Sequence, residues 1–73
     1  MAKKDNVVTI KGQVMKALPG LQFRVELEDQ DRTILAHLSG KMKMYRIRVV
    51  PGDTVRVEMP KETSERGRIV RRL

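Results

Sequence analysis

Apolar and polar residues alternate along five stretches of this chain, and the alternation predicts five β-strands. Side chains of a strand point alternately to its two faces, so a period of two indicates a strand that is buried on one side. In the first three stretches the residues on the inward face are Val8, Ile10, Gly12 and Val14, then Leu21, Phe23, Val25 and Leu27, then Ile34, Ala36 and Leu38. The last two strands are predicted at Thr54–Met59 and Gly67–Val70.

Turn signals separate these strands. Pro19-Gly20 follows Leu18, Pro51-Gly52 precedes Asp53, and residues 28–32 form a polar reversal. Proline presets the second position of a turn, and glycine accepts the positive φ that a type II turn needs at the third. Type II geometry does not match the twist of a two-residue hairpin, so we expect the Leu18–Leu21 connection to be longer than that.

Residues 39–45 interrupt the alternation and predict a short helical turn. Ser39 suits the N-cap of that turn, because a serine hydroxyl accepts a hydrogen bond from a free backbone N–H of the first turn. So short a helix is marginal on its own. We therefore expect Met42, Met44 and Ile47 to anchor it to the core.

The predicted fold class is all-β, a five-stranded OB-fold barrel with a short helical turn between strands 3 and 4. A five-stranded SH3-like barrel has a similar periodicity, and the helical break after the third strand favours the OB fold. A length of 73 residues leaves room for one small domain. We expect a single OB-fold RNA-binding domain at residues 7–71 and a flexible basic tail at residues 1–6.

The charge balance favours a polyanionic partner, because 16 basic residues face 9 acidic ones and give a net charge of +7. Two basic segments and the tail supply the candidate RNA-binding residues Lys41, Lys43, Arg46 and Arg48, then Arg66, Arg68 and Arg71, and Lys3. Four acidic residues between Glu26 and Asp31 predict an edge that repels a polyanion. A basic helix surface that meets only water is the alternative reading of the first segment.

Aromatic residues are too few for a platform that stacks many bases. The chain has one phenylalanine, Phe23, and one tyrosine, Tyr45, and Phe23 is predicted in the core. Binding of extended single strands relies on such stacking, so we expect phosphate contacts to dominate and a folded RNA surface to be favoured. Tyr45 and His37 are candidates for secondary RNA contacts, and an exposed histidine in contact with water is the alternative for His37.

Several classes of function find no support in the composition. One histidine, with no hydroxyl-histidine-carboxylate spacing, does not predict an enzyme. The same histidine without neighbouring ligands does not predict a metal site, and no cofactor is expected. The absence of cysteine fits a reducing interior, and no apolar run approaches the length of a membrane span. Without an apolar segment behind Lys3 and Lys4 we expect no secretory signal, and the expected compartment is the cytoplasm.

Ordered motifs along the chain resemble bacterial-type translation initiation factor one. The match runs from about residue 2 to 70, and its motifs are Leu18-Pro19, Phe23-Arg24-Val25-Glu26-Leu27, Ala36-His37-Leu38-Ser39-Gly40-Lys41-Met42, Ile47-Arg48, Pro51-Gly52-Asp53, Val55-x-Val57-Glu58 and Gly67-Arg68-Ile69-Val70. Each motif alone is weak, and together, in this order and spacing, they are specific.

The resemblance implies a monomeric OB barrel that binds the aminoacyl site of the small ribosomal subunit, between ribosomal RNA and a small-subunit protein. It also implies cooperation with the other initiation factors, and no catalysis. The positions that match the family's RNA contacts are Lys3, Lys41, Arg48 and Arg68, with Lys43 in place of a frequent arginine.

This chain departs from the resemblance at three places. Arg46-Ile47-Arg48 stands where the family usually has Tyr-Ile-Arg, charged residues fill the loop between Pro60 and Glu65, and the reversal near Asp31 is one residue longer. Two other functions stay open from the residues alone. One is a general RNA chaperone of cold-shock type, disfavoured because its aromatic strand motifs are missing, and the other is a protein-interaction adaptor that uses Leu35 and the methionines.

Overall fold

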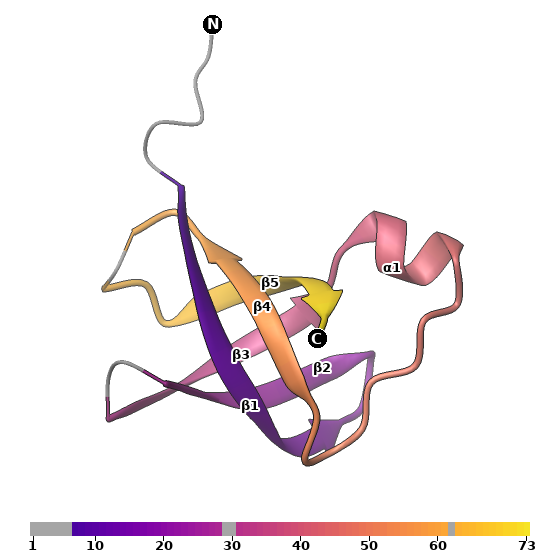
Figure 1. Ribbon diagram of the computed structural model, residues 1–73, viewed down its shortest axis with the longest axis horizontal. Helices are drawn as coiled ribbons and strands as arrows, with labels where there is room; N and C mark the ends of the chain where they lie inside the picture. Colours follow the sequence, from indigo (N-terminus) through magenta and orange to yellow (C-terminus); the bar gives the residue numbers. More distant parts are fainter. Residues whose placement is uncertain (1–6, 29–30, 62) are drawn as a thin grey trace, which may run out of the picture.

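The computed structural model describes residues 7–28, 31–61 and 63–73, so the expected tail, with Lys3, lies outside the described residues. The order of elements confirms the predicted one (Figure 1). In chain order the elements are β1 (Val8–Leu18), β2 (Gln22–Leu27), β3 (Arg32–Leu38), α1 (Gly40–Met44), β4 (Thr54–Met59) and β5 (Arg66–Arg72).

The five strands close into one barrel with the order β1-β2-β3-β5-β4. β3 and β5 pair in parallel, and all other neighbours pair antiparallel. The length of β1 makes closure possible, because its first half pairs with β4 and its second half with β2. A bulge at Met15 marks the change of direction, as bulges do where a strand bends.

The barrel interior is filled by the inward residues of the alternating pattern. The buried core comprises Val14, Phe23, Val25, Leu27, Ile34, Ala36, Leu38, Met42, Val49, Val55, Val57, Met59 and Ile69. Two glycines let strands pass close to this core: a Cβ on Gly12 would lie 2.6 Å from Val25 Cγ1, and one on Gly67 would lie 2.6 Å from Val57 Cγ1.

The β1–β2 connection corrects one prediction. It is longer than two residues, as expected, because Leu18 pairs with Gln22. Gly20 has the positive φ of 81° that the Pro-Gly signal predicts. Leu21, however, is not an inward strand residue: it lies in the turn with a φ of 58° and is 50% exposed. The alternation of β2 continues backwards to Leu21 in the sequence, but the left-handed backbone turns this side chain out of register.

The helix corrects a second prediction. Ser39 is its N-cap, as expected, and its hydroxyl accepts a hydrogen bond of 3.2 Å from the Met42 amide. Met42 is buried and Ile47 packs against the core, but Met44 is 73% exposed and anchors nothing. Residues two apart lie on nearly opposite sides of a helix, so α1 cannot bury both methionines.

Candidate nucleic-acid interface

The first basic segment begins on α1, where Lys41 and Lys43 are exposed. Both ends of α1 are held in place, so the backbone that carries these two lysines has a fixed position. The Ser39 cap holds its start, and the Ser39 amide donates to the Ile69 carbonyl of β5 at 3.0 Å. Both lysines lie in the last turn, where the helix dipole favours positive charge.

The end of α1 is a Schellman motif built on an arginine. The Arg46 amide donates to the Lys43 carbonyl at 3.1 Å, and the Ile47 amide donates to the Met42 carbonyl at 3.0 Å. This pair of bonds defines the motif, and Ile47 and Met42 occupy the two positions at which the motif usually has apolar residues. The motif requires a left-handed residue, which Arg46 provides with a φ of 54°. The backbone therefore directs the exposed Arg46 side chain away from the core at the start of the segment leading to β4.

The segment after α1 is tied to the end of β5. Arg72 donates from its guanidinium to the Arg48 carbonyl at 2.9 Å, and the Leu73 amide donates to the Thr54 carbonyl at 2.8 Å. Arg48 itself is exposed. Arg72 therefore acts on the first basic segment by holding its backbone.

A cleft of about 440 Å³ lies between the β1–β2 turn and this segment. We call it the hairpin cleft. Its lining includes apolar residues of β1, β2, β3 and α1 together with three of the predicted cations, Lys43, Arg46 and Arg48. The structure thus gathers most of the first basic segment at one opening.

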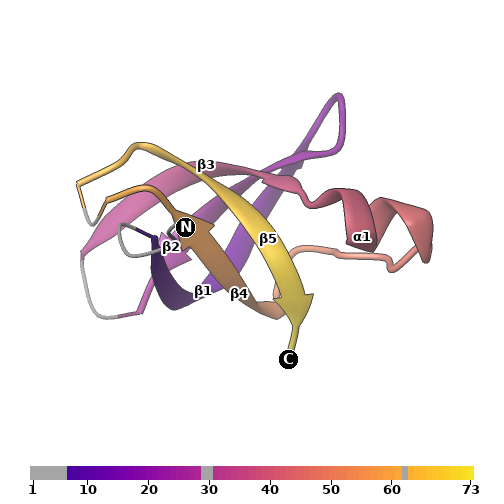
Figure 2. The same cartoon turned by 90° about the horizontal axis from the view of Figure 1, so that it is seen from above.

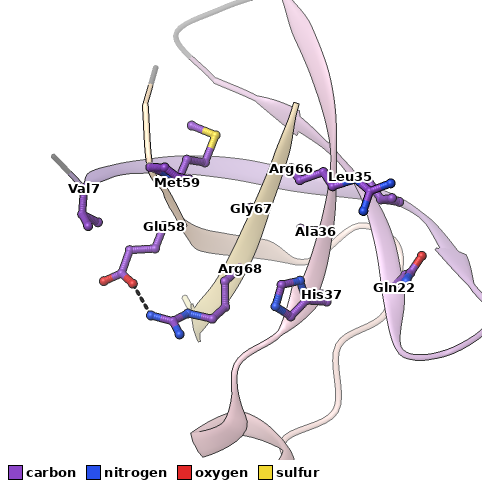
Figure 3. A pocket seen from close by; sticks show the side chains of 11 residues that line it. Val7, Gln22, Leu35, Ala36, His37, Glu58, Met59, Arg66, Gly67 and Arg68 are labelled. Carbon is purple, nitrogen blue, oxygen red and sulfur yellow. Dashed lines mark hydrogen bonds and ion pairs between the residues drawn. The ribbon is translucent and has the colours of Figure 1, made fainter. Parts of the chain in front are cut away.

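A second hollow of about 500 Å³, the outer groove, runs over the outside of β3 and β5 (Figure 3). Its lining includes Leu35, His37, Arg66 and Arg68. Register brings them together: Leu35 is the Cα partner of Arg66, and His37 that of Arg68. Figure 3 shows His37 and Arg68 side by side at the end of the groove nearer α1. This geometry groups His37 with the second basic segment.

Arg68 has an acidic neighbour that sequence reasoning did not assign to the site. Its guanidinium is 2.6 Å from Glu58 Oε1, across the β4–β5 pair in which the two residues are Cα partners. The ion pair fixes the guanidinium beside the groove and neutralises part of its charge. The register of β4 on β5 is a tertiary property, so no signal in the sequence pairs these two residues.

The remaining predicted residues lie outside both hollows. Tyr45 is 64% exposed at the end of α1, and Arg71 is exposed on β5. Phe23 is buried in the core, as predicted, which leaves Tyr45 as the exposed aromatic side chain. Lys41 lines neither hollow.

The described residues form neither a metal site nor a membrane-spanning helix. Within residues 7–28, 31–61 and 63–73, no three side chains of histidine, aspartate or glutamate gather closely enough to hold a metal ion. In the same described part of the chain, no helix has the length and apolar character needed to cross a membrane.

A closed five-stranded barrel in this order, with a helix between β3 and β4, defines the protein as an OB-fold domain, a class that binds oligonucleotides and oligosaccharides. The sequence model described as translation initiation factor 1A / IF-1 matches residues 1–73. This chain belongs to the translation initiation factor 1A/IF-1 family.

Two solved structures are similar to it. The solution structure of translation initiation factor IF-1 from the Wolbachia endosymbiont strain TRS of Brugia malayi is 38% identical, with a TM-score of 0.75. That match covers 97% of this chain and 83% of the other. The crystal structure of YjeQ from Thermotoga maritima is 29% identical with a TM-score of 0.73, and the match covers 90% of this chain and 23% of YjeQ. This chain is therefore similar to one part of YjeQ.

Proposed function

We propose that this translation initiation factor binds the aminoacyl site of the small ribosomal subunit and contacts ribosomal RNA there. In this proposal it acts as a monomer in the cytoplasm, beside a small-subunit protein, and cooperates with the other initiation factors. The barrel at residues 7–71 is the RNA-binding domain, and residues 1–6 are a basic tail. Family membership supports the role in initiation.

The observation that carries RNA contact is the fixed, basic surface of α1 and the segment after it. Lys41, Lys43, Arg46 and Arg48 are all exposed, and the Ser39 cap and Arg72 hold the backbone that presents them. Cations on a backbone that is already held in place lose less conformational entropy on binding phosphates than cations on a mobile segment do. Arg66, Arg68, Arg71 and the secondary candidates His37 and Tyr45 extend this surface.

Charge reversal of two residues tests the proposal. The double variant Lys41→Glu/Arg48→Glu should bind purified small ribosomal subunits at least about 100-fold more weakly, because each of the two cation–phosphate pairs contributes on the order of 1.4 kcal/mol or more. Affinity is measured by fluorescence anisotropy of the labelled factor.

The matched control reverses two exposed cations away from α1, in Lys11→Glu/Lys61→Glu. It changes the net charge by the same amount, so it should lose much less affinity than the first variant. Equal losses in the two variants would mean that overall charge, and not this surface, drives binding. Unchanged binding of Lys41→Glu/Arg48→Glu would contradict the proposed RNA contact.

A further inference from the structure

The hairpin cleft opens where β1 separates from the segment that leads to β4. Val14 of β1 is joined to the turn before β4 by two backbone hydrogen bonds, to Asp53 at 2.9 Å and to Gly52 at 2.7 Å. Beyond Val14 the described part of β1, residues 15–18, pairs with β2 alone. Figure 2 shows the β1–β2 turn projecting away from α1 and from the segment that leads to β4. One edge of β1 therefore borders the cleft without a strand partner.

Apolar side chains form the floor and part of the lips of the cleft. Phe23, Leu38 and Met42 are buried beneath it. Leu21 on one lip is 50% exposed, and Val50 on the other is 45% exposed. A ligand in the cleft would cover both, which removes apolar surface from water.

The backbone is strained on both lips. In the described part of the chain, Leu21 and Arg46 are the non-glycine residues with positive φ, and both line this cleft. Residues other than glycine, asparagine and aspartate seldom adopt this conformation, and such strain tends to cluster at ligand-binding sites. The Schellman motif accounts for Arg46. The three-residue loop between Leu18 and Gln22 accounts for Leu21, because such hairpin loops commonly end on a left-handed residue, and it leaves this leucine half exposed on the lip of the cleft.

The charges around the cleft select an acidic ligand. Lys43, Arg46 and Arg48 are its charged residues, and none of the described residues in its lining is acidic. Its floor is largely aliphatic and its single aromatic ring, Phe23, is buried, so a nucleotide base would find no exposed ring for stacking. A free strand edge beside an apolar floor is instead the arrangement that binds an extended peptide by strand addition.

We propose that the hairpin cleft binds an extended, acidic segment of a partner protein. Backbone groups of that segment pair with the edge of β1 at residues 15–18. Its alternate apolar side chains cover Leu21 and Val50, and its carboxylates meet Lys43, Arg46 and Arg48. These three cations also belong to the proposed RNA-binding residues, so RNA and the acidic segment compete for them.

Titration of the isotope-labelled protein with a short peptide of alternating glutamate and valine, in the absence of RNA, tests the proposal. We expect amide chemical-shift changes concentrated at residues 15–18, Leu21 and residues 46–50. A lysine–valine peptide should cause none of these changes. Shifts that spread evenly over Arg56, Lys61 and Arg71, or their absence at millimolar peptide, would overturn the proposal.

Two variants distinguish peptide binding in the hairpin cleft from nonspecific binding to exposed apolar side chains. Leu21→Asn keeps a residue that tolerates positive φ, and it should weaken peptide binding about tenfold or more, because the variant no longer offers an apolar side chain to the peptide. Met44→Gln is the matched control, since Met44 is exposed but lies outside the cleft, and it should leave binding unchanged. Equal effects of the two variants would contradict the assignment of the cleft.

The Leu21→Asn variant also distinguishes peptide binding from RNA binding. Leu21 is not among the proposed RNA-binding residues, so Leu21→Asn should bind small subunits as the parent protein does while it loses the peptide. An oligouridine that shifts the cleft amides when the peptide does not would identify the cleft as an RNA site and overturn the proposal.

Discussion

Arg46 combines two requirements that conflict at a single residue. Its position at the end of α1 demands a left-handed backbone, for which glycine is the usual choice. Its side chain is one of the exposed cations at the hairpin cleft. A left-handed conformation costs a non-glycine residue about 1–2 kcal/mol. The chain therefore keeps a charge at this position at a cost in stability.

Substitution of this residue should separate stability from binding. Arg46→Gly should raise the free energy of unfolding by about 0.5–1 kcal/mol, because relief of the left-handed strain exceeds the entropy that glycine adds to the unfolded chain. It should also weaken binding to the small subunit, because a cation is removed. Urea denaturation and fluorescence anisotropy measure the two effects.

Arg46→Ala is the control, because it removes the same charge but keeps the strain. We expect it to weaken binding as Arg46→Gly does, without a gain in stability. If Arg46→Gly and Arg46→Ala had equal stability, relief of the left-handed backbone would not be a source of stability at this position.

At the level of elements, β5 joins the barrel to the candidate interface. Its parallel pairing with β3 aligns Arg66 and Arg68 beside Leu35 and His37. Its end holds the segment after α1 through the hydrogen bond from Arg72 to the Arg48 carbonyl. Gly67 lies in the same strand, and its missing side chain lets β5 approach the core. The packing of β5 thus sets the position of both basic segments.

Gly67→Ala tests how closely β5 is packed. A Cβ at this position would lie 2.6 Å from Val57 Cγ1 and 2.9 Å from Met59 Cγ. We expect the free energy of unfolding to fall by about 1–3 kcal/mol, as for other overpacked cores. Urea denaturation measures this change.

Gly40→Ala is the matched control, because a Cβ there would meet no atom within 4 Å. Gly40 is the first residue of α1, where glycine costs less than in the middle of a helix, so this variant should be as stable as the parent protein or slightly more stable. An equal loss of stability in both variants would show that close packing is not the reason for glycine at position 67.

At the scale of the whole molecule, a group of acidic residues lies at the end opposite α1. Glu26, Glu28 and Asp31 lie near the β2–β3 turn, and α1 lies at the other end of the longest axis (Figure 1). That axis measures 32 Å, about four Debye lengths at physiological salt. The acidic end is therefore screened from the basic end and does not cancel its attraction for phosphates. It disfavours docking in the reverse orientation.

The salt dependence of binding should report the contacts of the basic end. If the proposed cations neutralise phosphates, the logarithm of the binding constant should fall against the logarithm of salt concentration by about 0.7–0.9 per phosphate. Lys41→Gln should reduce the slope by about one such unit, and Lys61→Gln, away from α1, should not. The slope is measured by anisotropy with small subunits, and a flat salt dependence would rule out electrostatic docking.

Periodicity and turn chemistry were enough to predict the elements and the inward face of nearly every strand. They failed at two apolar residues. The alternation of β2 was extended back to Leu21, which lies in the turn, and Met44 was counted among the anchors of α1 although it is exposed. The residue types of the candidate site were also predictable, since charge clusters are visible in the sequence. Their grouping was not, because strand register alone places His37 beside Arg68 and Glu58 against its guanidinium.

The place of β5 in the strand order also has a consequence for how the protein is made. β5 is the last element in the chain, yet it lies between β3 and β4 and closes the barrel. A growing polypeptide therefore cannot complete the fold until residues 66–72 have left the ribosome. Until then β3 and β4 each have an open edge, which is the kind of surface on which nascent chains associate wrongly. Closure of the barrel therefore has to wait until its most C-terminal strand has emerged.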